Sequence, residues 1–166
     1  MTMNTPFEHA VDRHGATVLR VCRAVLGPGP DADDAWSEAF LAALKSWPEL
    51  PEDTNVEAWL VRVAHRKSID ITRARARQIP TDALPDQVAT TGIPDAGQTW
   101  LWQALAELPE RQRLALAYHY FGGLSHVETA EITGSRPDAV RRAAADGIRK
   151  LRQAHGVLET PQGASR

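Results

Sequence analysis

The stretch from Asn55 to Arg77 constrains the fold more than any other part of this chain. It contains neither glycine nor proline, and its apolar residues recur at an interrupted helical spacing. This pattern predicts an amphipathic helix with one face in a hydrophobic core. The apolar positions are Val56, Trp59, Leu60, Val63, Ile71 and Ala74.

The opposite face of this predicted helix is basic. Its residues follow one another at steps of three or four, which places four guanidinium groups around one carboxylate. They are Arg62, Arg66, Asp70, Arg73 and Arg77, and Lys67 and Arg75 lie beside them. Such a face indicates either a solvated surface or a binding site for a polyanion.

Composition narrows the class of protein. The 166 residues carry a net charge of −2, so any affinity for nucleic acid must come from local patches. A single cysteine, Cys22, cannot form an internal disulfide and fits a reducing compartment. No apolar run approaches the ~20 residues of a membrane span, and the first residues lack the layout of a signal peptide. We therefore expect a cytoplasmic protein without membrane insertion.

Two helices are predicted before the basic one. The first ends at the turn Gly27-Pro28-Gly29-Pro30, and the second runs from Asp31 to Trp47 and stops at Pro48. Trp36, Phe40 and Trp47 form an apolar stripe on the second helix. Leu41 and Leu44 lie away from that stripe, so we expect them to face a partner protein.

A change of composition separates the two halves of the chain. Residues 78–98 are rich in proline, glycine, threonine and aspartate, which predicts a flexible linker. Fully extended, these residues would reach ~70 Å. The expected organisation is a helical domain at 1–77, the linker at 78–98, a second helical domain at 99–153 and a loose tail at 154–166.

The second half is also predicted to be helical. Two amphipathic helices precede Gly122-Gly123, and Ser125 with Glu128 forms a capping box that starts a short helix ending at Gly134. A longer basic helix follows and runs to about Gln153. A short helix, a tight turn with glycine and a basic helix indicate a helix-turn-helix.

Two sequence blocks resemble bacterial RNA polymerase sigma factors of the sigma-70 family. The segment Asp34-Ala-Trp-Ser-Glu38-Ala-Phe-Leu, followed by Trp59-Leu60, Ala64, Asp70 and Arg73, resembles region 2. The segment Leu108-Pro-Glu-Arg-Gln-Arg113, followed by Gly123-Leu-Ser-His-Val-Glu128, Ala130-Glu131, Gly134 and Val140, resembles region 4. Two blocks in this order around a linker resemble the extracytoplasmic-function (ECF) group. The implied fold is all-α, with a region 2 helical bundle and a region 4 helix-turn-helix.

The resemblance implies three interfaces. The second helix of region 2 would dock core RNA polymerase through Asp34, Ser37, Glu38, Leu41, Leu44 and Lys45. The third helix and the loop before it would melt and read the −10 element through Asn55, Arg62, Arg66, Lys67, Asp70, Arg73 and Arg77. We expect Asn55 to hydrogen-bond a captured base, and Asp70 to pair with Arg66 and Arg73 and so orient them.

Region 4 would read the −35 element in the major groove. The expected contacts are Ser135, Arg136, Asp138, Arg141, Arg142, Arg149 and Arg152, of which the last two would hold phosphates. Several positions differ from the family pattern, among them Ser37, Arg66, Asp138, Ala143 and Asp146. The resemblance therefore implies a promoter-directed function without fixing the promoter sequence.

Two other functions would fit part of the sequence. A helix-turn-helix regulator that binds DNA without polymerase would leave residues 1–77 without a role, and a degenerate sigma-like protein would occupy polymerase without initiating. No catalytic, metal or cofactor site is predicted, since the sequence has no phosphate-binding loop and no paired histidine ligands. The implied partners are core RNA polymerase and promoter DNA, with an anti-sigma protein as a further candidate.

Overall fold

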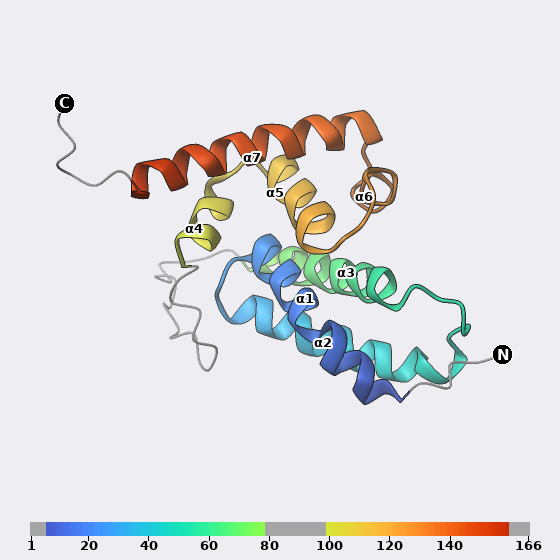
Figure 1. The fold of residues 1–166 in the computed structure, drawn as a ribbon. Helices are drawn as coiled ribbons and strands as arrows, with labels where there is room; N and C mark the ends of the chain where they lie inside the picture. The colour runs from blue at the N-terminus through green and yellow to red at the C-terminus, as the bar shows by residue number, and fades with distance from the viewer. Residues whose placement is uncertain (1–5, 79–98, 160–166) are drawn as a thin grey trace, which may run out of the picture.

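The computed structural model describes residues 6–78 and 99–159 (Figure 1). Helices form the secondary-structure elements of these residues, as predicted. They are α1 (Phe7–Leu26), α2 (Pro30–Ser46), the 3₁₀ turn η1 (Trp47–Glu49), α3 (Val56–Arg77), α4 (Thr99–Glu107), α5 (Glu110–Ala115), the π-helical segment η3 (Leu116–Phe121), α6 (His126–Thr133) and α7 (Pro137–Glu159). Residues 79–98 of the predicted linker and 160–166 of the predicted tail lie outside the described residues.

Local sequence signals set most of the helix ends. Gly27 ends α1 with a φ of 87°, a conformation that glycine adopts without steric cost. The Asn55 side chain caps α3 by accepting a hydrogen bond from the Ala58 amide at 3.2 Å. Ser125 and Glu128 form the predicted capping box at the start of α6. The caps at Asn55 and Ser125 set where α3 and α6 begin.

Two predicted ends are wrong. Helix α2 begins at Pro30, one residue before the predicted start at Asp31, and has Gly29 at its N-cap. The carboxylate of Asp31 accepts a hydrogen bond from Arg75 at 2.5 Å. Helix α7 continues to Glu159, so the first residues of the predicted tail are helical. The stacking of His155 on Trp100, with ring centroids 4.7 Å apart, ties this extension to α4.

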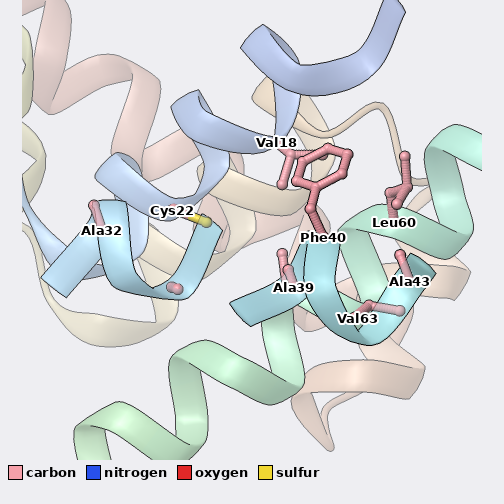
Figure 2. Packing of buried hydrophobic residues seen from close by; sticks show 10 residues of the cluster. Val18, Cys22, Ala32, Ala39, Phe40, Ala43, Leu60 and Val63 are labelled. Atoms are coloured by element: carbon pink, nitrogen blue, oxygen red, sulfur yellow. The ribbon is translucent and has the colours of Figure 1, made fainter. Parts of the chain in front are cut away.

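Helices α1, α2 and α3 enclose the first part of the core (Figure 2). The buried face of α2 consists mostly of alanines, whose small side chains let α1 and α3 approach it closely. The ring of Phe40 fills the space between Val18 and Leu60. The Trp36 indole donates a hydrogen bond to the Gly15 carbonyl at 2.9 Å, which fixes α2 against α1.

The second half builds its core around the π-helical segment. Trp102, Leu105, Leu116 and Val140 are buried together between α4, α5, η3 and α7. Gly147 permits the close packing of α7, because a Cβ there would lie 2.8 Å from the Leu116 side chain. The long basic helix is thus held by its apolar side, which leaves its other side in solvent.

The two halves also pack against each other, which the sequence did not predict. Val21 and Val61 from the first half form one buried cluster with Tyr118 and Leu124 from the second. A Cβ on Gly122 would lie 3.1 Å from Val61 and 3.2 Å from Val21, so the backbone at the end of η3 lies directly on α1 and α3. Figure 1 shows α7 on one side of the molecule and the bundle of α1, α2 and α3 on the other, with α5 between them.

Replacing Phe40 by alanine should destabilise the protein strongly. The ring is 5 % exposed at the centre of the first core, and truncation of a buried phenylalanine costs roughly 3–5 kcal/mol. The neighbouring Leu41→Ala is the matched control, because a surface change costs about 0.5 kcal/mol or less. Urea unfolding measures both, and equal losses in the two variants would contradict the described packing of α2.

Candidate polymerase and nucleic-acid interfaces

The basic face of α3 is present and largely exposed. Arg66, Arg73 and Arg77 are exposed on this helix, and Lys67 is half-buried beside them. The expected pairing of Asp70 with Arg66 and Arg73 is wrong, since within the described ranges Asp70 forms no ion pair. Exposed ion pairs contribute little because solvent screens them and both side chains lose freedom. The exposed guanidinium groups therefore remain available to an external anion.

Arg62 differs from the other arginines of this face. Its guanidinium lies 3.4 Å from a carboxylate oxygen of Glu128 and 3.8 Å from one of Glu131, both on α6. The pKa of Glu128 is lowered, first by its capping-box hydrogen bond to the Ser125 backbone and further by Arg62. One end of the basic face is thus occupied by acidic side chains of the second half.

The start of α3 borders a hollow. Asn55 is exposed, but its side-chain oxygen is already used to cap α3. The next residue, Val56, lines a hollow of about 540 Å³ together with Trp47 and residues of α1 that include His9 and Arg13. Trp59 is partly buried against Trp47, with ring centroids 6.3 Å apart, so its role is in the core.

All seven residues predicted to read the −35 element are exposed. Ser135 and Arg136 lie in the turn before α7, and the other five lie along α7. Arg141 pairs with Asp138 at 3.1 Å and Arg149 pairs with Asp146 at 2.8 Å. These pairs are local and solvent-exposed, so phosphates can compete for both arginines.

The predicted docking residues share one exposed face of α2. They are Asp34, Ser37, Glu38, Leu41, Leu44 and Lys45. The side chain of Leu41 is 59 % exposed and that of Leu44 is 50 % exposed, although leucine is among the residue types most often buried. This face combines two uncovered leucines with flanking charges, an arrangement typical of a docking surface.

A buried polar contact that the sequence did not predict joins the two halves. His65 on α3 is 7 % exposed, and its Nδ1 lies 2.5 Å from the Tyr118 hydroxyl of η3. The sequence did hold a signal, because Val61, His65 and Ser68 form a second helical stripe beside the apolar one. All three are buried, so α3 packs on two sides rather than one.

Burial lowers the pKa of His65 below its ordinary value of 6.5. A hydrogen bond with the backbone of Ile132 opposes this shift, and the nearby charge of Arg66 adds to it. The neutral ring is therefore favoured, with the Tyr118 hydroxyl donating to Nδ1. Burial also raises the pKa of Tyr118, and it raises the pKa of the Cys22 thiol to about 12, which makes that thiol unreactive.

The described residues contain no cluster of three or more side chains suited to a metal ion. Within the same ranges, no helix is both long and apolar enough to cross a membrane.

Comparison with known proteins decides the family. The family model described as Sigma-70 region 2 matches residues 10–78, and the model described as Sigma-70, region 4 matches residues 98–151. The ECF RNA polymerase sigma factor ShbA of Streptomyces griseus is 32 % identical over 152 residues, which cover 81 % of this chain and 79 % of ShbA. The chain belongs to the ECF sigma factors. It is a promoter-recognition factor of bacterial transcription.

Other relatives agree with this placement of the sigma factor. The ECF sigma factor SigM of Mycobacterium tuberculosis is 29 % identical over 156 residues, covering 93 % of this chain and 79 % of SigM. Among solved structures, the sigma factor RpoE in complex with the anti-sigma factor NepR from Bartonella quintana matches with a TM-score of 0.71 at 17 % identity, covering 91 % of this chain and 97 % of that one. CnrH in complex with the cytosolic domain of CnrY matches with a TM-score of 0.63 at 23 % identity, covering 93 % and 89 %. These two likenesses show that the fold is shared.

The contact between the halves of this sigma factor should weaken in acid because His65 is held neutral. Its pKa is lowered in the folded chain, so below about pH 6.5 the unfolded chain binds more protons than the folded chain. The free energy of unfolding should therefore fall as the pH falls from 6.5 through the lowered pKa. In a His65→Gln variant, which cannot take up this proton, the loss between about pH 7.5 and 5.5 should be smaller.

Urea unfolding at each pH measures this difference. The other charged and titratable groups near the ring, directly or through Tyr118, are Arg66, Tyr118, Cys22 and Arg113, and burial holds the pKa values of Tyr118 and Cys22 far above this range. Identical pH profiles for the parent and His65→Gln would show that His65 does not sense acid.

Proposed function

We propose that this sigma factor divides promoter recognition among three exposed surfaces on three helices. The α2 face around Leu41 and Leu44 docks core RNA polymerase. The α3 arginine face and the loop before it hold the melted −10 strand, and the N-terminal part of α7 reads the −35 element. One observation carries this assignment: every predicted contact residue except Arg62 and Lys67 is exposed.

The chemistry of each surface fits its assigned role. Guanidinium groups such as Arg66 and Arg73 suit phosphates, and the hollow lined by Val56 and Trp47 offers space for a base outside the stack. On α7, Arg141 and Arg142 stand near the helix start, where base edges are reached, and Arg149 and Arg152 suit phosphates. The domain division at residues 77 and 99 is part of the same proposal.

The partners and location are part of the same proposal. Sigma factors RpoE and CnrH were solved in complex with NepR and CnrY, and NepR is named an anti-sigma factor. By analogy, an anti-sigma protein restrains this chain, and the protein acts in the cytoplasm with core RNA polymerase. In-vitro transcription with core polymerase on genomic fragments tests the proposal, because a regulator without initiating activity would yield no transcript.

Changing Glu38 and Leu41 together to alanine should abolish binding to core polymerase. Both side chains are exposed, so the fold should persist while the docking face loses an apolar contact and a charge. The matched control is Asp33→Ala, which removes one charge from the first turn of the same helix. A pull-down with core polymerase gives the result, and full binding by the double variant would show that this face is not the docking surface.

Reversing Arg66 and Arg73 to glutamate should prevent promoter opening while polymerase docking and −35 binding persist. Holding one base out of the stack costs a few kcal/mol, and the phosphate contacts of this face would supply part of that free energy. Changing both residues to lysine is the control, since it keeps the positive charge. Permanganate footprinting detects unpaired thymines, and normal opening by the glutamate variant would mean that the arginine face is only a solvated surface.

A further inference from the structure

An acidic residue stands among the arginines at the start of α7. Nη1 of Arg141 donates a hydrogen bond to Oδ1 of Asp138 at 3.1 Å, and the two side chains are 63 % and 80 % exposed. The opposite side of the helix is buried through Val140 and Ala144, so the pair faces solvent. Asp138 is the only acid among the seven residues assigned to the −35 element, and its charge repels phosphates. General attraction to DNA therefore does not account for it.

Arg141 keeps free donors on one edge while it is bound to Asp138. A guanidinium has more N–H donors than one carboxylate oxygen can accept, and the bond at Nη1 leaves Nε and Nη2. Among the described residues, Arg141 makes no other hydrogen bond or ion pair. Guanine presents two neighbouring acceptors, O6 and N7, in the major groove, and an arginine fork binds both at once. The free edge of Arg141 thus matches one base.

The pair lies where a recognition helix meets base edges. Helix α7 begins at Pro137, and in a helix-turn-helix the N-terminal residues of the second helix contact bases in the major groove. A second pair of the same spacing, Asp146 with Arg149 at 2.8 Å, lies two turns further, or about 12 Å along the axis. The two pairs share their local geometry and differ in their place along the helix, so the second is a matched comparison for the first.

We propose that Asp138 is a specificity-determining residue of the −35 interface: it positions Arg141 so that the free edge of the guanidinium donates to O6 and N7 of one guanine. The inference rests on the proposed role of α7 in −35 recognition. A guanidinium that is already held loses less rotamer freedom when it binds a base. Its fixed direction also rejects adenine, which presents an amino donor beside its N7 acceptor.

Solvent screens this pair in the free protein, and contact with a base removes that screening. An exposed ion pair contributes little in water, because the dielectric constant is high and both side chains lose freedom. In the major groove, displacement of water lowers the local dielectric constant and strengthens the attraction between Asp138 and Arg141. Asp138 therefore contributes most when guanine is bound, which is the condition for discriminating between bases.

A carboxylate in the first helical turn also has a purely structural effect. It interacts favourably with the positive end of the helix dipole, and this stabilises the start of α7. Loss of that effect would weaken binding to every sequence equally, because the helix would be less well formed whatever the DNA. Loss of a positioning residue would instead change the preference at one base pair. The two roles of Asp138 are thus separated by a sequence profile rather than by an affinity.

The profile is measured with holoenzyme assembled from the full chain and core RNA polymerase. Holoenzyme is mixed with duplex DNA in which the −35 element of a transcribed genomic promoter is randomised, and the bound DNA is sequenced. The parent should favour guanine at one position, and Arg141→Ala should lose that preference. Asp138→Ala should lower the preference for this guanine about tenfold, and the double variant should lose no more than Arg141→Ala alone. Asp146→Ala, the matched control, should keep the parent's preference at this position.

Three results would overturn the inference. They are an unchanged guanine preference in Asp138→Ala, an equal loss of affinity for all sequences in that variant, and dependence of a base other than guanine on Arg141. Failure of the proposed function gives a different result: changing Arg141 and Arg142 together to alanine would then leave the whole −35 profile as in the parent. A profile that changes with Arg141→Ala and not with Asp138→Ala overturns the inference alone.

Discussion

Helix α1 is buried from two directions, and the rest of the structure depends on this. Val18 and Cys22 enter the core shared with α2 and α3, while Val21 and Ala24 enter the clusters built with the second half. If α1 had only one buried face, the two halves could separate without exposing apolar surface of α1 to water. Because α1 lends side chains to both cores, separation must expose apolar surface, and each half contributes to the stability of the other.

The sequence predicted the individual helices well, and the faces it assigned to binding are largely exposed. Periodicity and caps placed α3 and α6, and the excess of apolar residues on α2 singled out Leu41 and Leu44, both of which are exposed. These features are local, because a helix face or cap is determined by residues a few positions apart. The family assignment needed only two such blocks in the right order.

The contact between the halves could not be predicted in the same way. It joins residues such as His65 and Tyr118, which are 53 positions apart, and periodicity does not say which buried stripe meets which. Composition indicated a linker, and a linker permits contact as readily as separation. The expected pairing of Asp70 with neighbouring arginines also failed, because helical spacing allows such a pair but solvent competes for both partners. Spacing thus located the arginine face and could not show that Arg62 is bonded to α6.

The π-helical segment at 116–121 sets the rotational phase of everything that follows it. A π-helical backbone hydrogen bond spans one residue more than an α-helical one, and one residue corresponds to about 100° of rotation in an α-helix. In this phase Tyr118 points into the molecule and Tyr120 points outward. Loss of a single residue here would turn the side chains on one side of the deletion by about a quarter of a revolution relative to the other. For this chain, a change in length within the segment would therefore be harder to tolerate than most changes in residue type.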